Sequence, residues 1–348
     1  MRDVARSLRL LISRRVEGSR RSAPLFAASL IVGATALVLF SPVGAPTSAV
    51  AQEAATKAER KVAVTIDDLP GVGIPDSERC DFEALARYAG ELLATLTTHA
   101  VPATGFVTEG NLCDEIPSER LRELLGMWLD AGMELGNHTY SHPDLNRTAT
   151  ALFKEDIVRG EGALRRVLDE RNQPLRWFRY PQLHAGDDAS VKAEIETFLA
   201  ARNYEIAPVT IDNQEYVFAN LYAAAKEAGN EELMVRIVEA YLSHMQEVFA
   251  FFEEYSVEVV GYEMPQVLLL HANALNADHL GRLLSMLEGR GYEYVQLSDA
   301  LSDPAYALAD GYVGPQGLSW LHRWALGKGM EIRMEPREDE YVRELQRR

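Results

Sequence analysis

The stretch KVAVTIDDLP, residues 61–70, decides the fold class of this 348-residue chain. It is largely an apolar run, which is typical of a strand that is buried on both faces of a parallel sheet. The run ends in two adjacent carboxylates, Asp67 and Asp68. Because functional side chains of parallel β/α folds gather where the strands end, the stretch predicts a strand over residues 62–66 and a candidate site directly after it.

The alternation of β-rich runs with helical stretches continues over about 240 residues and predicts an α/β fold with a parallel sheet, closed or open. The predicted strands cover residues 62–66, 103–107, 133–137, 176–178, 204–209, 267–270 and 292–297. The predicted helices cover residues 81–98, 118–131, 150–170, 189–201 and 277–290. These elements place one folded domain within residues 60–303.

Two segments depart from this alternation. Residues 213–265, between the fifth and sixth predicted strands, contain helical patterns near 219–228 and 231–255 and predict a helical insertion. After residue 303 the pattern degrades into a turn-rich and then a charged segment. We therefore interpret residues 304–348 as a C-terminal extension that packs partly on the domain and is disordered at its end.

The first 51 residues predict a signal peptide. Residues 2–21 carry seven arginines against two acidic residues, and an apolar run follows over residues 23–40. Residues 49–51 read Ala-Val-Ala, which fits the A-x-A cleavage rule of secretory signals. We therefore expect an exported protein, periplasmic or secreted. The apolar run is also nearly long enough to span a bilayer, so a retained membrane anchor is the alternative.

The charge of the chain bears on its partners. Its formal net charge is −17, and residues 1–51 carry seven arginines and two acids, so the remainder carries −22. Nucleic acids are bound by basic patches, so this acidity argues against a nucleic-acid partner. It also disfavours polyanionic substrates, and neutral sugars or small uncharged amides fit better.

The chain contains two cysteines, Cys80 and Cys113. In an exported protein they can form a disulfide, and Cys80 opens a predicted helix while Cys113 follows the next predicted strand. A paired and an unpaired state are equally compatible with the sequence. Neither cysteine has a nearby histidine, so a cysteine-based metal or nucleophilic site is not expected.

A second stretch, NHTYSHPDLN at residues 137–146, supplies His138 and His142. Histidines four positions apart converge on one ion if the loop that carries them turns as a helix does. One aspartate, two histidines and a second, free carboxylate are what a catalytic zinc-type site needs: three protein ligands, an open position for water, and a base. The two stretches together predict a metal-dependent hydrolytic site.

Three more polar residues lie at strand ends. Arg179 ends the fourth predicted strand, Asp212 follows the fifth, and His271 ends the sixth. His271 is interpreted as a general acid that protonates a leaving nitrogen, with a buried core histidine as the alternative. Arg179 is expected to pair with the catalytic carboxylate and hold it ionised and oriented. The remaining candidates lack such a context and are expected to be structural: His184, His244, His279 and His322.

The motifs TIDDLP, HTYSH, RYP, DNQEY and LLH resemble, in this order, the five motifs of the NodB-type polysaccharide deacetylases, carbohydrate esterase family 4. The resemblance covers about residues 60–303. It implies a distorted (β/α) barrel, here with a helical insertion, that hydrolyses the N-acetyl amide of N-acetylglucosamine-type sugars in a polysaccharide or oligosaccharide. It also implies a divalent metal, in the first place Zn²⁺, with Co²⁺, Ni²⁺ or Fe²⁺ as alternatives.

The resemblance also implies roles for individual residues. Asp68, His138 and His142 correspond to the metal ligands, Asp67 to the catalytic base, and His271 to the acid. The remaining catalytic candidates are Arg179 as the partner of the base and either Glu215 or Asp212 as the residue that orients the acid. The expected substrate-binding residues are Tyr180, Pro181, Tyr216 and Leu269.

Some positions depart from the family pattern. Ile66 and Leu69 replace the usual Phe and Gly around the two carboxylates, and Glu215-Tyr216 replaces an Asp-Trp pair. The helical insertion is expected to narrow or cap the site, which disfavours a long polymer. Two rival interpretations are therefore kept: a metal-dependent hydrolase of a non-sugar amide or imide, and a catalytically inactive barrel that binds glycan.

Overall fold

The structure, a computed structural model, describes residues 60–347, which belong to one compact unit. The predicted leader, residues 1–51, and its alternative as a membrane anchor lie outside the described residues. Within the described part, every helix is too short or too polar to cross a membrane.

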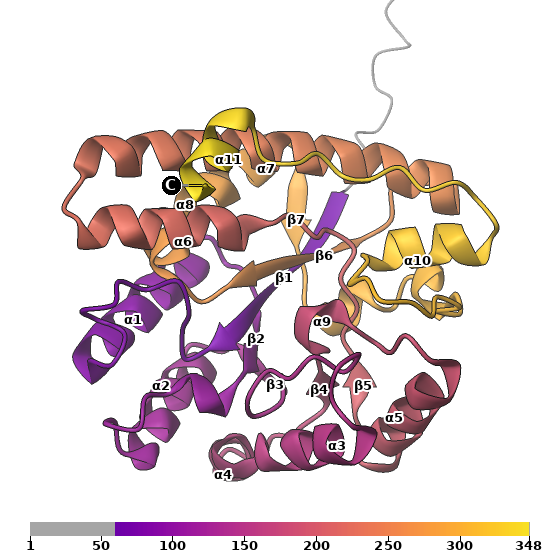
Figure 1. The fold of residues 1–348 in the computed structure, drawn as a ribbon, viewed down its shortest axis with the longest axis horizontal. Helices are drawn as coiled ribbons and strands as arrows, with labels where there is room; N and C mark the ends of the chain where they lie inside the picture. Colours follow the sequence, from indigo (N-terminus) through magenta and orange to yellow (C-terminus); the bar gives the residue numbers. More distant parts are fainter. Residues whose placement is uncertain (1–59, 348) are drawn as a thin grey trace, which may run out of the picture. The chain divides into compact units, whose positions relative to one another are not determined.

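Seven strands form one sheet in which every pair is parallel, in the order β5-β4-β3-β2-β1-β6, with β7 also paired to β1. Figure 1 shows the strands at the centre with helices around them. After β5, Ile211 bridges to Leu268 of β6, so the curled sheet meets itself at one point. This arrangement confirms the expected α/β class and its distorted barrel form. The strands are β1 Arg60–Leu69, β2 Thr104–Val107, β3 Glu134–Asn137, β4 Trp177–Phe178, β5 Glu205–Ile206, β6 Gln266–His271 and β7 Tyr292–Tyr294.

The strand β1 alternates between two buried environments. Val62, Val64 and Ile66 pack into the large core between sheet and helices. Ala63 belongs to a second cluster inside the barrel, which includes residues of β2, β4 and β6. Side chains of a strand alternate between its faces, so Asp67 shares the inner face with Ala63. The apolar run therefore directs its terminal carboxylate into the barrel.

Helices cover the outside of the sheet (Figure 1). The predicted helix over residues 150–170 is wrong in one respect, because it is broken at Gly160 and Glu161 into two helices. A Cβ atom on Gly160 would lie 2.6 Å from the Thr139 carbonyl carbon, so the break admits the loop that carries the two histidines. The helices are α1 Phe82–Thr98, α2 Ser118–Asp130, α3 Thr150–Arg159, α4 Gly162–Asp169, α5 Ala189–Ala201, α6 Glu215–Glu227, α7 Glu231–Val260, α8 Ala274–Gly289, α9 Leu297–Ala300, α10 Trp320–Gly327 and α11 Glu340–Gln346, with 3₁₀ turns η1 Glu109–Asn111, η2 Pro181–Leu183 and η3 Pro304–Ala307.

The insertion and the C-terminal extension pack on each other. Helices α6 and α7 lie between β5 and β6 in the sequence, α10 packs on α7, and α11 packs on α6. The extension differs from the expectation that it ends in disorder. Asp339 caps the start of helix α11, because its side chain accepts a hydrogen bond from the amide of Val342, and Val342 is buried. The N-cap and the one buried side chain stabilise this helix. The charged sequence of residues 336–348 does not indicate that Val342 is buried.

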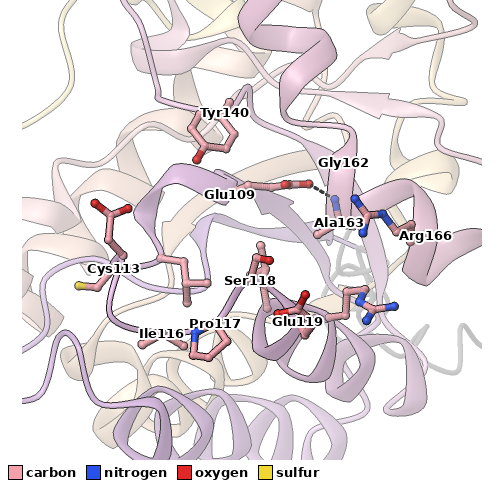
Figure 2. A pocket seen from close by; sticks show the side chains of 14 residues that line it. Glu109, Cys113, Ile116, Pro117, Ser118, Glu119, Tyr140, Gly162, Ala163 and Arg166 are labelled. Atoms are coloured by element: carbon pink, nitrogen blue, oxygen red, sulfur yellow. Dashed lines mark hydrogen bonds between the residues drawn. The ribbon is translucent and has the colours of Figure 1, made fainter.

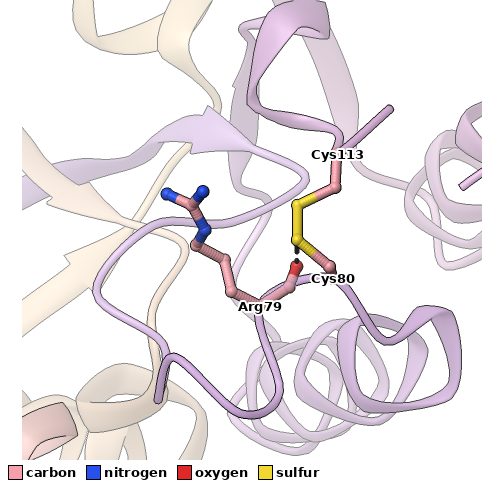
Figure 3. Close-up of a disulfide and its surroundings, with 3 residues drawn as sticks. All are labelled: Arg79, Cys80 and Cys113. Carbon is pink, nitrogen blue, oxygen red and sulfur yellow. Dashed lines mark hydrogen bonds between the residues drawn. A yellow bond between two sulfur atoms is a disulfide. The ribbon is translucent and has the colours of Figure 1, made fainter. Parts of the chain in front are cut away.

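Cys80 and Cys113 form a disulfide (Figure 3), so the sequence alternative with paired cysteines is the one observed. The bond joins the loop that precedes α1 to the loop that follows η1, and the Arg79 carbonyl oxygen lies 3.7 Å from the Cys113 sulfur. The first of these loops follows β1, whose end carries Asp67 and Asp68.

We expect the double substitution Cys80→Ala and Cys113→Ala to lower the free energy of unfolding by about 3 kcal/mol, because it removes a cross-link from the unfolded chain. The linked positions are 33 residues apart, which is a long loop for such a restraint. Urea unfolding of both proteins, with and without a reductant, measures the effect. A reductant that destabilises the double variant as much as the wild type would contradict this assignment.

Candidate functional site

A cavity of about 620 Å³ opens at the carboxyl ends of the strands. It contains residues from three parts of the chain: the barrel strands and their loops, the start of α6, and the C-terminal extension. Of the sequence candidates, the following line it: Asp67, Asp68, His138, His142, Tyr180, Asp212, Glu215, Tyr216, Leu269 and His271. The cavity therefore brings together residues separated by up to 268 positions in the sequence, from Asp67 to Glu335.

Both carboxylates of β1 reach this cavity because β1 contains a bulge. Ile66 pairs with Gly105 and Leu69 pairs with Val107, so β1 has one residue more than β2 over this interval. Asp68, inside the bulge, has a left-handed backbone with φ of 65°. Regular alternation would direct adjacent side chains to opposite faces. A bulge re-aims a side chain, and here it places Asp68 beside Asp67 in one site.

Asp67 is buried and faces a buried guanidinium. Arg179 Nη1 lies 3.3 and 3.2 Å from the two Asp67 carboxylate oxygens. The remaining donors of Arg179 reach Thr65 Oγ1 at 3.1 Å and the Ala207 carbonyl at 2.8 Å. Burial raises the pKa of Asp67, and the charge of Arg179 opposes that rise. Arg179 thus occupies the partner position that the sequence predicted.

The loop with the two histidines does not turn as a helix, contrary to the condition set from the sequence. Left-handed residues at Thr139 and His142, with φ of 69° and 55°, bring the two imidazole centroids within 4.9 Å instead. The Asp156 carboxylate accepts hydrogen bonds from the amides of Tyr140 and Ser141, each at 2.9 Å. A side chain of α3 therefore fixes the turn between the histidines.

Asp68, His138 and His142 form a donor set that fits a divalent ion. Asp68 Oδ1 lies 3.8 Å from the Nε2 atom of each histidine. Two ligand atoms at 2.0–2.2 Å from a shared ion lie less than about 4.4 Å apart, so these separations are compatible with a common ion. All three donor atoms lie within 4.8 Å of one another.

The tautomer of His138 suits a metal ligand. Its Nδ1 lies 2.9 Å from the Arg179 carbonyl oxygen, which only accepts, so Nδ1 carries the proton and Nε2 is left with its lone pair. Burial and the neighbouring His142 lower the pKa of His138 to about 3, so the imidazole is neutral at ordinary pH. Neutral imidazole is the form that binds metals.

His271 lies beside Asp67, because the two residues are paired in register on the neighbouring strands β6 and β1. Its Nδ1 lies 2.8 Å from Glu215 Oε2. Burial alone would lower the pKa of His271, but the hydrogen bond and charge of Glu215 raise it to about 9. Glu215 is itself buried and held by Asn273 and Asn276, whose amide groups donate to its other oxygen. Glu215 is therefore the carboxylate that contacts the His271 imidazole.

Asp212 was the other candidate for orienting His271. Its carboxylate accepts a hydrogen bond from the Asn213 amide at 2.9 Å, and among the described contacts none joins it to His271. Burial, followed by the charge of Glu335, raises the pKa of Asp212 to about 6. Asp212 and Glu335, a carboxylate of the C-terminal extension, line the same cavity.

The four expected substrate-binding residues divide into two groups. Tyr216, Leu269 and Tyr180 line the cavity, and Tyr216 is 53% exposed, as suits a rim residue. Pro181 is a correction, because it is buried in the turn η2 and does not line the cavity. The two residues that follow it, Gln182 and Leu183, line it instead. Both have left-handed backbones, which turn the chain toward the site.

Sequence reasoning missed the contribution of the C-terminal extension. It expected the helical insertion to narrow the site, yet α7 does not line the cavity and α6 contributes only its first turns. Seven residues after position 315 line it: Gln316, Gly317, Leu318, Ser319, His322, Met334 and Glu335. The sequence around Gly317 is turn-rich and looks like that of an ordinary loop, so it does not indicate that these residues line the cavity.

A second cavity, of about 290 Å³, lies between α2, α4 and the loop near Cys113 (Figure 2). Glu109 is its central polar group, and its Oε1 accepts hydrogen bonds from the amides of Ala163 and Leu164 at 2.6 and 3.0 Å. These are amides of the first turn of α4, which a carboxylate stabilises. Glu109 therefore has a structural role. Cys80, Cys113 and Glu115 also lie close together, but the disulfide removes both thiolates as ligands.

Residues 54–197 match the family described as polysaccharide deacetylase. The match includes both carboxylates of β1, both histidines of the loop, and Arg179. The NodB-type resemblance is confirmed. A chitooligosaccharide deacetylase of Bradyrhizobium sp. (strain ANU 289) is 33% identical over 75 residues, which is 22% of this chain and 32% of that relative. The matched segment thus spans about a third of the curated relative.

Three solved structures are similar at lower levels of identity. A mutant of BA3943, a CE4 family pseudoenzyme from Bacillus anthracis with restored enzymatic activity, is 18% identical, with a TM-score of 0.44 over 70% of this chain and 68% of that one. Peptidoglycan deacetylase PdaC from Bacillus subtilis is 17% identical, with a TM-score of 0.43 over 71% and 92% of the two chains. Polysaccharide deacetylase Bc1974 from Bacillus cereus is 17% identical, with a TM-score of 0.45 over 68% and 91%.

Proposed function

We propose that this protein is an exported, metal-dependent hydrolase that removes the acetyl group from N-acetylglucosamine-type sugars. One observation carries the proposal. Asp67 and His271, paired in register at the ends of β1 and β6, face the same cavity as the ligand set of Asp68, His138 and His142. A base, an acid and a metal-binding set on adjacent strands are what amide hydrolysis requires.

Asp68, His138 and His142 are the residues that would hold the ion, with zinc as the first candidate. When bound, a divalent ion supplies Lewis-acid polarisation of the acetamide carbonyl and makes a water molecule acidic enough to attack near neutral pH. The chain's own residues perform the proton transfers. The donor set, with its neutral His138, supports this assignment without distinguishing zinc from cobalt, nickel or iron.

Asp67 accepts the proton of the water that attacks the acetamide carbon. Its carboxylate is buried and held by the Arg179 guanidinium at 3.2 Å, which fixes its orientation and keeps it ionised. Burial raises the pKa of Asp67 and so makes the carboxylate a stronger base than an exposed aspartate. The Asp67 Oδ2 atom lies 3.7 Å from His138 Nε2, so the base is adjacent to the ligand set.

His271 donates a proton to the departing amine nitrogen. With its pKa raised to about 9, the imidazole is protonated at neutral pH and ready to act as an acid. Glu215 accepts a hydrogen bond from the Nδ1–H of His271, so the proton on Nε2 is the one available to the leaving group. The products are acetate and a free amino sugar. The C–N bond breaks as the proton reaches nitrogen, and the water oxygen is retained in acetate.

We expect Glu215→Gln to move the alkaline limb of the kcat/KM profile to lower pH. Without the Glu215 charge, burial lowers the pKa of His271 from about 9 towards or below its ordinary value of 6.5, so the acid loses its proton earlier. The pH dependence of kcat/KM measures the shift, and a histidine titration by NMR assigns it to His271. An alkaline limb that stays near pH 9 would contradict the role of Glu215.

Export is supported by two features of different kinds. The leader pattern of residues 1–51 fits a secretory signal. The disulfide between Cys80 and Cys113 is of the type that persists in oxidising compartments. Fractionation of the producing cells, with detection of the protein in the periplasm or the medium, tests this part of the proposal. Recovery from the cytoplasm with both thiols free would contradict it.

Acetate release by the zinc-loaded protein from N-acetylated chitooligosaccharides tests the reaction, with a cyclic imide as a second substrate. We expect acetate from the sugar and no ring opening of the imide. Ring opening without acetate would favour the non-sugar amide hydrolase. Tight glycan binding without acetate would favour an inactive glycan-binding barrel. The similarity of residues 54–197 to polysaccharide deacetylases supports the sugar.

A further inference from the structure

Besides His322 of α10, the C-terminal extension lines the active-site cavity with two short segments, residues 316–319 before α10 and residues 334–335 after it. Together we call these six residues the C-terminal wall. They lie outside the part of the chain that matches the deacetylase family, residues 54–197.

The first segment of the wall is fixed against the barrel. A Cβ atom on Gly317 would lie 1.9 Å from the Gln182 carbonyl oxygen, so only glycine allows this approach. The buried Arg323 holds the Leu318 carbonyl with its Nε at 2.9 Å and pairs with Asp310 at 2.9 Å. Such a close approach, together with an ion pair made by a buried guanidinium, is typical of a fixed surface.

His322 joins the two segments of the wall. Its Nδ1 accepts a hydrogen bond from Ser319 Oγ at 2.9 Å, and its Nε2 donates to the Arg333 carbonyl oxygen at 2.7 Å. Its ring packs against that of Tyr255 in α7, with centroids 5.0 Å apart. Arg333 also pairs with Glu258 of α7 at 2.8 Å. The second segment, Met334 and Glu335, is thereby held in place next to the first.

A fixed wall limits what enters the site. A polymer that reacts at an internal sugar must pass the catalytic residues on two sides, which requires an open groove. Here the cavity has about 620 Å³, within the range of ~300–1,000 Å³ that small-molecule sites occupy. Figure 1 shows the segment between α10 and α11 running beside α7 toward α6, the helix that forms another side of the site.

We propose that the C-terminal wall sets the length of the substrate, so that the reacting acetamido sugar enters as a chain end or as part of a short oligosaccharide. Gln316 and Met334, both exposed at the rim, are its specificity-determining residues. This inference rests on the proposed function. It assigns the selection of substrate length to the C-terminal extension and not to the residues of the barrel.

The kinetic test compares N-acetylated chitooligosaccharides from two to six units with a soluble acetylated polymer, using the full-length zinc-loaded protein. The proposal predicts acetate from the short members, deacetylation confined to one end unit by mass spectrometry, and little reaction with the polymer. The combined substitutions Gln316→Ala and Met334→Ala are expected to raise kcat/KM for the polymer about tenfold relative to the disaccharide. Internal deacetylation by the wild type would overturn the proposal.

The matched control is Leu326→Ala, on the exposed side of α10. Leu326 is 37% exposed, belongs to the same extension and does not line the cavity. Its substitution is expected to leave the length profile unchanged. A control that changes the profile as much as the rim variants do would overturn the assignment to Gln316 and Met334. Met334 is 50% exposed, so its truncation is expected to leave the fold intact.

Binding provides a readout that does not depend on turnover. Calorimetric titration of the metal-free full-length protein with the same oligosaccharides is expected to show an affinity that rises over the first members and then stays constant. An affinity that keeps rising to the longest oligosaccharide would contradict the wall, whether or not acetate is released. Absence of acetate together with a short binding limit would refute the proposed reaction and retain the wall. If neither acetate release nor a short binding limit is observed, the proposed reaction and the role of the wall are both refuted.

Discussion

Replacing His138 by alanine is expected to abolish acetate release and to weaken zinc binding by more than about 100-fold. His138 is buried, and its tautomer is fixed by the Arg179 carbonyl at 2.9 Å, so its Nε2 is the best prepared of the three donors. Without it, Asp68 and His142 remain as two ligands, and two ligands hold a divalent ion weakly. A chromogenic chelator in competition with the protein measures the affinity for zinc.

The control for this substitution is His99→Ala, which removes a histidine at the end of α1. His99 pairs with Glu288 at 2.7 Å, away from the cavity. We expect this variant to keep its zinc affinity and its turnover. If the His138 variant bound zinc as tightly as the wild type, the ion would have to lie elsewhere, and the assignment of the ligand set would be wrong.

Replacing Asp67 by asparagine is expected to lower kcat by about 10²–10⁴-fold, the range that a positioned general base contributes. Zinc binding should persist, because Asp68, His138 and His142 are unchanged. This separation of turnover from metal content distinguishes a base from a ligand. Acetate release and zinc content, measured on the same preparation, provide the two readouts.

The Asp67 substitution also has a cost in stability. It leaves the buried guanidinium of Arg179 without its carboxylate partner at 3.2 Å, and breaking such a buried pair costs about 3–5 kcal/mol. Urea unfolding therefore accompanies the kinetics, so that loss of fold is not read as loss of catalysis. Asp130→Asn, which opens an exposed pair with Arg171, is the surface control. Zinc loss in a folded Asp67 variant would show that this residue is a ligand.

Much of the fold was predictable because β1 and β6 are long apolar runs with polar ends. A continuous apolar run predicts a strand that is buried on both faces, at the centre of a parallel sheet. Because β1 and β6 are paired and parallel, their polar ends, Asp67 and His271, lie at the same end of the sheet. The same logic fails for short elements. The strands β4 and β5 have two residues each, and their extent is set by pairing with neighbours rather than by composition.

The candidate site was predictable where the chemistry of a side chain allowed one role, as it did for Arg179. Arg179 was expected beside the carboxylate, and a buried guanidinium there has no other partner of comparable charge among the described residues. The choice between Glu215 and Asp212 was open, because both carboxylates lie in the same motif, DNQEY. Two asparagines of the α8 start, Asn273 and Asn276, decide it by holding Glu215. That contact is tertiary and leaves no local signal.

Two further features depended on backbone conformation. Asp68 shares the cavity with Asp67 through a bulge and a left-handed residue, whereas regular strand alternation would direct the two side chains to opposite faces. Gln182 and Leu183 replace Pro181 at the cavity for the same kind of reason. A non-glycine residue with positive φ is uncommon, so sequence reasoning has no basis for expecting one at these positions.

The most direct test of the central claim is acetate release by the purified protein before chelation, after removal of metal, and after reloading with stoichiometric zinc. An N-acetylated chitodisaccharide is the substrate, and zinc content is measured in parallel. The account predicts that turnover disappears with the metal and returns in proportion to the zinc restored. Turnover that is indifferent to chelation, or absent from fully zinc-loaded protein, would contradict it.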